Sequence, residues 1–195
     1  MQSASPRRHL LRAPEAWRVV SKDPFQSHGN IQFARDANEH GPTLQISRGK
    51  PGSGVNYRGP VPRMNYAISA EARRTEGDDF FYGLTFPIND QHASLIVGGW
   101  GGGVWGVSNL DGLSAVENET TGYREFTLGQ WYKIVLRVTP SRVTVDLDDE
   151  NIIDFGTQEH QYSVWPEQAT MIPLGIATWK TSAEVRQLTL ERVGG

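Results

Sequence analysis

The chain has 195 residues, of which 37% are hydrophobic and 21% charged, with a net charge of −3 and no cysteine. This composition is that of a globular protein, and the basic residues are too scattered to form a phosphate-binding surface, so nucleic acid is not an expected partner. The lack of cysteine excludes disulfides, thiol nucleophiles and thiolate metal sites. No apolar run approaches the roughly 18 residues of a membrane span.

The N-terminal segment is basic and short of apolar residues. Residues 1–14 contain only Leu10 and Leu11 as an apolar centre, which is too short for the core of a secretory signal. No leader is visible, and the sequence leaves the compartment open. Since β-sandwiches of this length commonly form one unit, we expect a flexible basic tail over residues 1–14 and a single domain over residues 15–195.

The rest of the chain has the pattern of a β-protein. Short runs of β-branched and aromatic residues recur, separated by Gly, Pro, Asn and Asp, and no long segment has the 3.6-residue apolar spacing of a helix. This pattern predicts an all-β fold, a two-sheet antiparallel jelly-roll sandwich of the concanavalin A-like type. The predicted strands are 17–20, 30–34, 43–47, 55–58, 65–74, 80–86, 93–98, 104–108, 130–139, 142–147, 152–155, 172–179 and 184–192.

Alternation of apolar and polar residues assigns the two faces of several strands. In the strand 65–74, Tyr66, Ile68, Ala70 and Ala72 share one side. The segment 130–147 alternates in the same way on both sides of a turn, which predicts a hairpin. One side of each strand is therefore expected in the core and the other on the surface.

An aromatic and glycine-rich segment, residues 78–112, is a candidate ligand site. Sugars are recognised by flat aromatic faces together with a few placed polar groups. Trp100 and Trp105 lie among glycines that would leave room for a sugar ring, and Tyr82, Asp90 and His92 could supply polar contacts. The alternative is that the aromatic residues simply pack in the core as good strand formers. The glycines beside Trp100 favour a groove or rim for that residue.

Glu117 and Glu119 are the candidate catalytic pair. On an extended backbone they would project to the same side, about 6.5 to 7 Å apart. Retaining glycosidases place two carboxyls about 5 to 5.5 Å apart and inverting ones about 6.5 to 9.5 Å, so the spacing does not select a mechanism. The alternative is a solvated loop with no catalytic role.

Metal and cofactor signals are weak. Asp146, Asp148 and Glu150 alternate, but they fall at a predicted hairpin turn, where Asp is common for structural reasons. The five histidines show none of the spacings of a zinc site. We expect no cofactor, with calcium at a loop of the sandwich as the one possibility left open.

Three segments carry a family resemblance: MNYAISAEARRTEGDDFFYGLTF, GQWYKIVLRVTPSRVTVDLDDENIID and IPLGIATWKTSAEVRQLTLERV. They resemble the 3-keto-disaccharide hydrolase family, over roughly residues 28–192. The resemblance implies a jelly roll whose concave face handles glycans or oxidised glycosides. Many members carry a histidine at or near the position of Trp179, so the resemblance supports binding at this position more directly than hydrolysis.

Three functions follow as hypotheses. The first is a carbohydrate-active domain that uses Glu117 and Glu119 as acid and base on a glycoside. The second is a noncatalytic glycan-binding or cell-surface interaction module, and the third is a structural protomer of an assembly, since the sequence leaves the oligomeric state open. The predicted ligand-binding residues are Tyr82, Asp90, His92, Trp100, Trp105 and Trp179.

Overall fold

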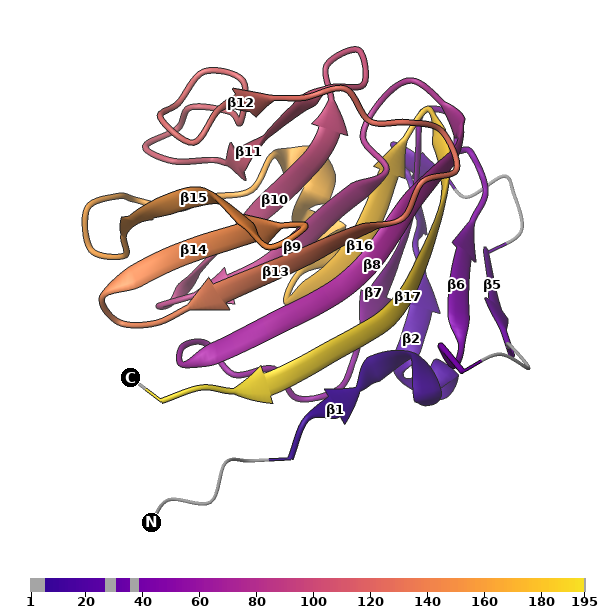
Figure 1. Cartoon of the computed structure of the whole chain (residues 1–195), viewed down its shortest axis with the longest axis horizontal. Coiled ribbons are helices and arrows are strands. Elements are labelled where there is room, and N and C mark those ends of the chain that lie inside the picture. The colour runs from indigo at the N-terminus through magenta and orange to yellow at the C-terminus, as the bar shows by residue number, and fades with distance from the viewer. Residues whose placement is uncertain (1–5, 27–30, 36–38, 195) are drawn as a thin grey trace.

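The computed structural model describes residues 6–26, 31–35 and 39–194. Two antiparallel sheets lie one behind the other, as Figure 1 shows, and they enclose the main apolar core. The predicted two-sheet antiparallel sandwich is therefore confirmed. Residue 30, where one strand was predicted to begin, lies outside the described residues. No helix in the described part of the chain is long and apolar enough to cross a membrane.

The first sheet has eight strands. Their order is β15 (Glu150–Gly156), β14 (Arg142–Leu147), β13 (Tyr132–Val138), β8 (Tyr66–Gly77), β17 (Thr181–Arg192), β6 (Thr43–Ile46) and β5 (Ile31–Ala34), with β1 (Arg8–His9) paired to β17.

The second sheet has seven strands, and short elements complete the chain. Its order is β12 (Gly122–Tyr123), β11 (Val104–Ser108), β10 (Gln91–Gly99), β9 (Tyr82–Ile88), β16 (Leu174–Trp179), β7 (Gly52–Tyr57) and β2 (Trp17–Val19). The remaining elements are the pair β3 (Ser21–Lys22) and β4 (Phe25–Gln26) and the 3-10 helices η1 (Leu10–Arg12), η2 (Pro14–Ala16) and η3 (Pro166–Met171).

The predicted alternation of faces is confirmed in the first sheet. Ile68 and Ala70 of β8 are buried, and they pair with Leu136 and Ile134 of β13. Because side chains alternate across a strand, the residues between them point outward. The hairpin predicted over residues 130–147 is present as β13 and β14.

The flexible tail predicted over residues 1–14 is corrected for residues 6–14. Leu10 and Leu11 are buried in the main core, and the indole N–H of Trp17 donates to the carbonyl of Leu10 at 3.0 Å. Arg8 and His9 add β1 to the edge of β17. Two leucines are too few for a signal core, but they are enough to dock a short arm on a sandwich. Residues 1–5 lie outside the described residues.

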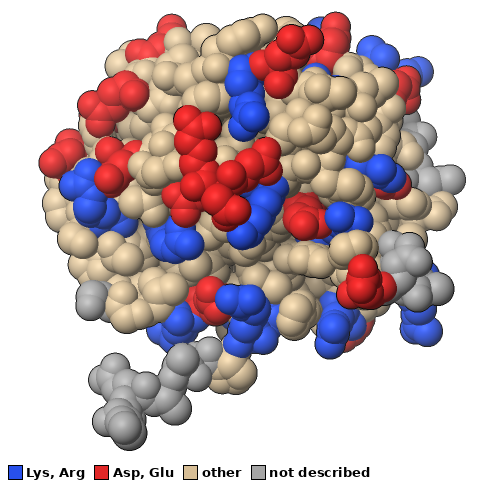
Figure 2. All heavy atoms as spheres, viewed as in Figure 1, with Lys and Arg blue, Asp and Glu red and all other residues tan. Residues whose placement is uncertain are grey.

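The outer face of the first sheet carries paired charges. Arg73 pairs with Glu184 and Arg186 with Glu71, both at 2.5 Å, and the two guanidinium groups lie 4.6 and 4.0 Å from the ring centre of Trp131. Figure 2 shows basic and acidic side chains next to one another on the face that it views. In each of these two pairs, the charge of one side chain is balanced by a neighbour of opposite sign.

The turn between β14 and β15 uses its carboxylates within the protein. Asp146 contacts Arg137 at 2.5 Å, and Asp148 accepts the backbone N–H of Lys133 at 2.9 Å. These contacts give Asp146 and Asp148 a structural use at a hairpin turn. Calcium at a loop of the sandwich stays a prediction.

The outer face of the second sheet carries a second, smaller apolar cluster. Ile96 of β10 belongs to it, whereas the neighbouring Leu95 and Val97 point into the main core. The helix η3 covers part of this face, and its Met171 belongs to the same cluster. A site on this face can therefore be walled by residues that are distant in sequence.

Candidate functional site

A cavity of about 120 Å³ opens on the outer face of the second sheet. We call it the aromatic pocket. Its lining residues are Asp79, Phe80, Ile96, Trp100, Ser108, Trp165, Gln168 and Trp179.

Exposed indoles form the mouth of the aromatic pocket. Trp100 and Trp165 are 37% and 36% exposed, and their rings meet edge to face at 84° with centroids 6.0 Å apart. Deeper in the pocket, Trp179 stacks on Phe80 with centroids 6.4 Å apart. The pocket therefore offers apolar ring faces in more than one orientation, while most of each mouth indole remains packed.

Asp79 is a fixed carboxyl group in this apolar wall. Its Oδ1 accepts the backbone N–H of Phe80 at 2.7 Å, and the backbone N–H of Trp100 also donates to the carboxylate. Its own N–H donates to Oγ1 of Thr181 at 3.0 Å. Burial raises the pKa of Asp79 despite these two donors. A half-buried carboxyl with a raised pKa in a cleft is a candidate for binding or proton transfer.

Gln168 supplies an acceptor without a partner. It lies on η3 and is 3% exposed, and its Oε1 has no hydrogen-bond partner among the described residues. Nearby, Oγ of Ser108 accepts the backbone N–H of Ala115 at 2.8 Å. Gln168 lines the pocket, but Oε1 itself has almost no accessible surface, so a ligand donor reaches this oxygen only if the side chain turns toward the cavity.

One buried arginine holds the wall that carries Asp79 and Trp100. Nη2 of Arg74 donates to the carbonyls of Asp79, Gly98 and Gly102 at 3.1, 3.0 and 2.8 Å. Trp100 has a φ of 47°, which is uncommon for a bulky residue. The carbonyls flanking Trp100 are thus tied to one guanidinium group, which stabilises this turn.

One buried asparagine holds the opposite wall. Nδ2 of Asn56 lies 2.8, 2.9 and 3.2 Å from the carbonyls of Met171, Ile172 and Leu174, at the end of η3. A Cβ at Gly54 would lie 2.6 Å from the Met171 side chain, so the glycine lets η3 lie directly on the sheet. This contact positions Trp165 and Gln168 at the pocket.

Four of the six predicted ligand-binding residues have aromatic rings, and the structure divides them. Trp100 and Trp179 line the aromatic pocket. Tyr82 is 1% exposed in the main core, and burial raises the pKa of its phenol well above the usual value. Trp105 is partly buried, packs against the main core and covers Gly122. Tyr82 and Trp105 are therefore held by the interior and do not line the pocket.

Asp90 and His92 lie at the other end of β9 and β10. The tight turn before β10 contains Asp90, and His92 pairs with Pro87. His92 precedes Trp100 by eight residues, about 26 Å along an extended strand. Burial and the charge of Arg63 lower the pKa of His92. The structure does not bring Asp90 and His92 to the aromatic pocket.

Glu117 and Glu119 lie in a series of turns, so the extended geometry considered for this pair is absent. Glu117 accepts from Oγ of Ser114 at 2.5 Å, and Oε1 of Glu119 lies 2.9 Å from Nε2 of His160. Both glutamates are exposed, and neither lines the aromatic pocket. Their catalytic role stays a prediction.

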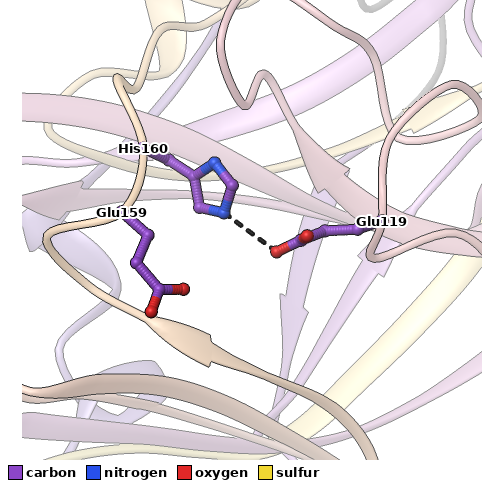
Figure 3. A group of neighbouring side chains, drawn as sticks. All are labelled: Glu119, Glu159 and His160. Atoms are coloured by element: carbon purple, nitrogen blue, oxygen red, sulfur yellow. Dashed lines mark hydrogen bonds and ion pairs between the residues drawn. The ribbon is translucent and has the colours of Figure 1, made fainter.

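His160 is the centre of a separate polar cluster, shown in Figure 3 with Glu119 and Glu159. Its Nδ1 lies 2.7 Å from Oδ2 of Asp111, and its side chain is 12% exposed. Burial lowers the pKa of His160, but the hydrogen bonds with Asp111 and Glu119 outweigh burial and raise it overall. The potential ligand atoms of Glu119, Glu159 and His160 lie within 4.8 Å of one another. A carboxylate behind the histidine is also common at metal sites.

The sequence did not predict five polar or aromatic residues that line the pocket: Asp79, Phe80, Ser108, Trp165 and Gln168. Asp79 lies inside the predicted aromatic segment, but two adjacent aspartates before a strand give no sign of which one is buried. Gln168 lies in η3 and Trp165 is the N-cap residue just before it, both far along the chain. The pair Trp165-Pro166, a tryptophan in a segment without strand alternation, is the one local signal that could have indicated an exposed ring.

Comparison of sequences identifies one family. The sequence model of the family described as 3-keto-alpha-glucoside-1,2-lyase-like domain matches residues 20–191. No curated protein matches the chain.

Several solved structures share the fold at low sequence identity. The carbohydrate-binding module CBM66 from Bacillus subtilis superposes with a TM-score of 0.56 at 14% identity, over 90% of this chain and 95% of that chain. A protein of unknown function with a galectin-like fold from Bacillus subtilis has a TM-score of 0.62 at 10% identity, with coverages of 97% and 96%. Domain 4 of the arabinanase AbnA from Geobacillus stearothermophilus, in complex with arabinotriose, has a TM-score of 0.53 at 12% identity, with coverages of 96% and 93%. These likenesses show a jelly-roll fold.

Proposed function

The chain belongs to the family of 3-keto-alpha-glucoside-1,2-lyase-like domains, and from this premise we propose that it is a carbohydrate-active jelly-roll domain that binds a glycoside in the aromatic pocket. One observation carries the proposal. The pocket combines the exposed indoles of Trp100 and Trp165 with the carboxyl of Asp79, whose oxygens accept hydrogen bonds. A sugar presents apolar C–H faces to such rings and hydroxyl donors to such acceptors.

The size of the pocket limits what it encloses. Sites for drug-sized ligands commonly measure about 300 to 1,000 Å³, whereas this cavity measures about 120 Å³. The pocket therefore holds one terminal ring of a glycan, and the rest of the ligand lies outside. The mouth indoles Trp100 and Trp165 are placed to contact that ring as it enters.

The solved structures support this function by analogy of fold. One is a carbohydrate-binding module, and another was determined in complex with arabinotriose. The pocket of this chain gives the analogy a physical basis, because its lining has the aromatic and polar groups that sugar binding requires.

Replacing Trp165 by alanine, or Trp100 by alanine, is expected to weaken glycan binding by at least tenfold. Truncating a central tryptophan commonly costs about 2 kcal/mol or more of binding free energy. A glycan array on the wild type selects a ligand, and isothermal titration calorimetry then compares the variants. Trp131→Ala is the matched control, because Trp131 lies between Arg73 and Arg186 on the first sheet. Equal binding by all four proteins would remove the pocket as the site.

Catalysis is a second candidate function, favoured by the raised pKa and fixed position of Asp79. Asp79 is the one carboxylate that lines the pocket, whereas glycoside hydrolysis ordinarily uses two. A single base can serve a 1,2-elimination on a 3-keto glycoside, since the ketone acidifies the C2–H bond. Asp79 would take the C2 proton, the C1–O bond would break, and the proton would pass to the leaving oxygen.

The change Asp79→Asn is expected to lower turnover of a 3-keto glucoside by at least a hundredfold while the ligand still binds. Loss of a general base commonly costs 10² to 10⁴ in rate. Release of the leaving alcohol from a chromogenic 3-keto glucoside measures the rate. The variants Glu117→Gln and Glu119→Gln test the predicted pair in the same assay. Full turnover by Asp79→Asn with loss in the glutamate variants would assign the chemistry to that pair instead.

A further inference from the structure

We infer that the aromatic pocket selects glycans whose terminal ring is uncharged and rejects those that end in an acidic sugar. This selectivity rests on the proposed function, because it concerns the ligand of the same pocket. Three features of the lining support it: an orphan acceptor, a fixed carboxylate, and the absence of a lining cation.

The orphan acceptor is Oε1 of Gln168. The residue is 3% exposed, and Oε1 has no partner among the described residues. Oε1 has almost no accessible surface, so a ligand hydroxyl can donate to it, and remove the cost of leaving it unpaired, only when the side chain of Gln168 turns toward the cavity.

The carboxylate of Asp79 disfavours an acidic ligand more strongly, because it carries a negative charge. The backbone N–H groups of Phe80 and Trp100 hold it in the pocket wall, so it cannot turn away from an incoming group. Apolar rings surround it, and charges interact more strongly there than in water. A second carboxylate in a pocket of this size is therefore repelled, whereas a hydroxyl can donate to Asp79.

No cation lines the pocket to offset this repulsion. The lining residues include no lysine, arginine or histidine. The guanidinium of Arg74 is not among the lining residues; its Nη2 donates to the carbonyls of Asp79, Gly98 and Gly102, and its positive charge interacts with the carboxylate of Asp79. Lys180 is exposed and is the weakest of the influences on the pKa of Asp79. The described lining residues therefore carry one negative charge and no positive charge, and the charge of Arg74 behind them is already shared with Asp79.

Matched pairs of glycosides test the selectivity. Methyl glucoside and methyl glucuronide differ only in C6, as do methyl galactoside and methyl galacturonide. Calorimetric titration at pH 7.5 is expected to give the neutral glycoside of the pair that binds a dissociation constant at least tenfold lower than that of its uronide. The change Asp79→Asn removes the charge. It is expected to reduce the ratio of the uronide and neutral dissociation constants to about threefold or less, because the uronide binds more tightly.

Asp78→Asn is the matched control. Asp78 is exposed, adjoins Asp79 and does not line the pocket, so the ratio is expected to stay that of the wild type. If Asp79→Asn does not fold, Asp79→Ser keeps an oxygen that can accept from Phe80 and removes the same charge. Thermal unfolding of each variant identifies those that fold.

Three outcomes would overturn the selectivity. Equal or tighter binding of the uronide by the wild type contradicts it, as does an unchanged ratio in the folded Asp79 variant. In both cases, loss of binding in Trp165→Ala would leave the proposed function standing. Binding of no sugar to the wild type, on the array or in titration, would overturn the proposed function together with the selectivity.

Discussion

Replacing Arg74 by methionine is expected to lower the free energy of unfolding by about 3 kcal/mol. The guanidinium group donates to three carbonyls, and each buried acceptor left without a donor costs about 1 to 3 kcal/mol. Burial lowers the pKa of Arg74, so the charged group itself carries a desolvation cost that the variant relieves. The net loss is therefore smaller than the sum for three carbonyls. Methionine keeps an apolar side chain of similar length over Phe81.

Urea denaturation followed by tryptophan fluorescence measures this loss. Arg73→Met is the matched control, because Arg73 is adjacent on β8 and pairs with Glu184 near the surface, where ion pairs contribute about 0 to 1 kcal/mol. Glycan binding by Arg74→Met is expected to fall as well, since the turn of Trp100 loses its anchor. A loss no greater than that of Arg73→Met would show that water or the backbone satisfies these carbonyls.

Replacing Asn56 by leucine is expected to cost about 3 kcal/mol of stability through the other wall of the pocket. Asn56 is 0% exposed, and its amide serves the carbonyls of Met171, Ile172 and Leu174. Leucine has a similar volume and no donor, so these carbonyls would lose their amide partner in the interior. Because η3 carries Trp165 and Gln168, the helix is expected to move and glycan binding to fall with both pocket residues intact.

Thermal and urea unfolding of Asn56→Leu, with glycan titration, tests this role. Asn151→Leu is the matched control, since the amide of Asn151 also reaches the carbonyls of Val145 and Ile153, but at an exposed position where water can replace it. Its cost is expected to stay below about 1 kcal/mol. If Asn56→Leu is as stable as Asn151→Leu and binds the glycan equally well, the amide of Asn56 does not hold the end of η3.

Much of the fold could be predicted because a strand records its two faces in alternate residues. Ile68 and Ala70 were assigned to the core on this basis, and both are buried. The rule failed at the N-terminus, where Leu10 and Leu11 dock without any repeating pattern. It predicted no strand at Glu117 and Glu119, and the turns found there correspond to the loop that was the alternative to an extended pair.

The candidate site was predictable only in part. Glycine neighbours indicated that Trp100 lies at a rim, and Trp179 was predicted to shape the same groove. Both residues line the pocket. Asp90 and His92 are close to Trp100 in sequence but lie at the far end of β10. Sequence proximity misleads in a sheet, since each residue along a strand adds about 3.3 Å of separation.

By itself, the sequence determined that this chain forms antiparallel strands with one apolar side each, and that aromatic rings and glycines gather near Trp100. Only the tertiary structure decided that Asp79, Gln168 and Trp165 share one pocket, and that Arg74 and Asn56 hold its walls. The physical reason is that alternation specifies which side of a strand meets the core. It says nothing of which loop or helix covers the opposite side, because that depends on contacts between segments distant in sequence.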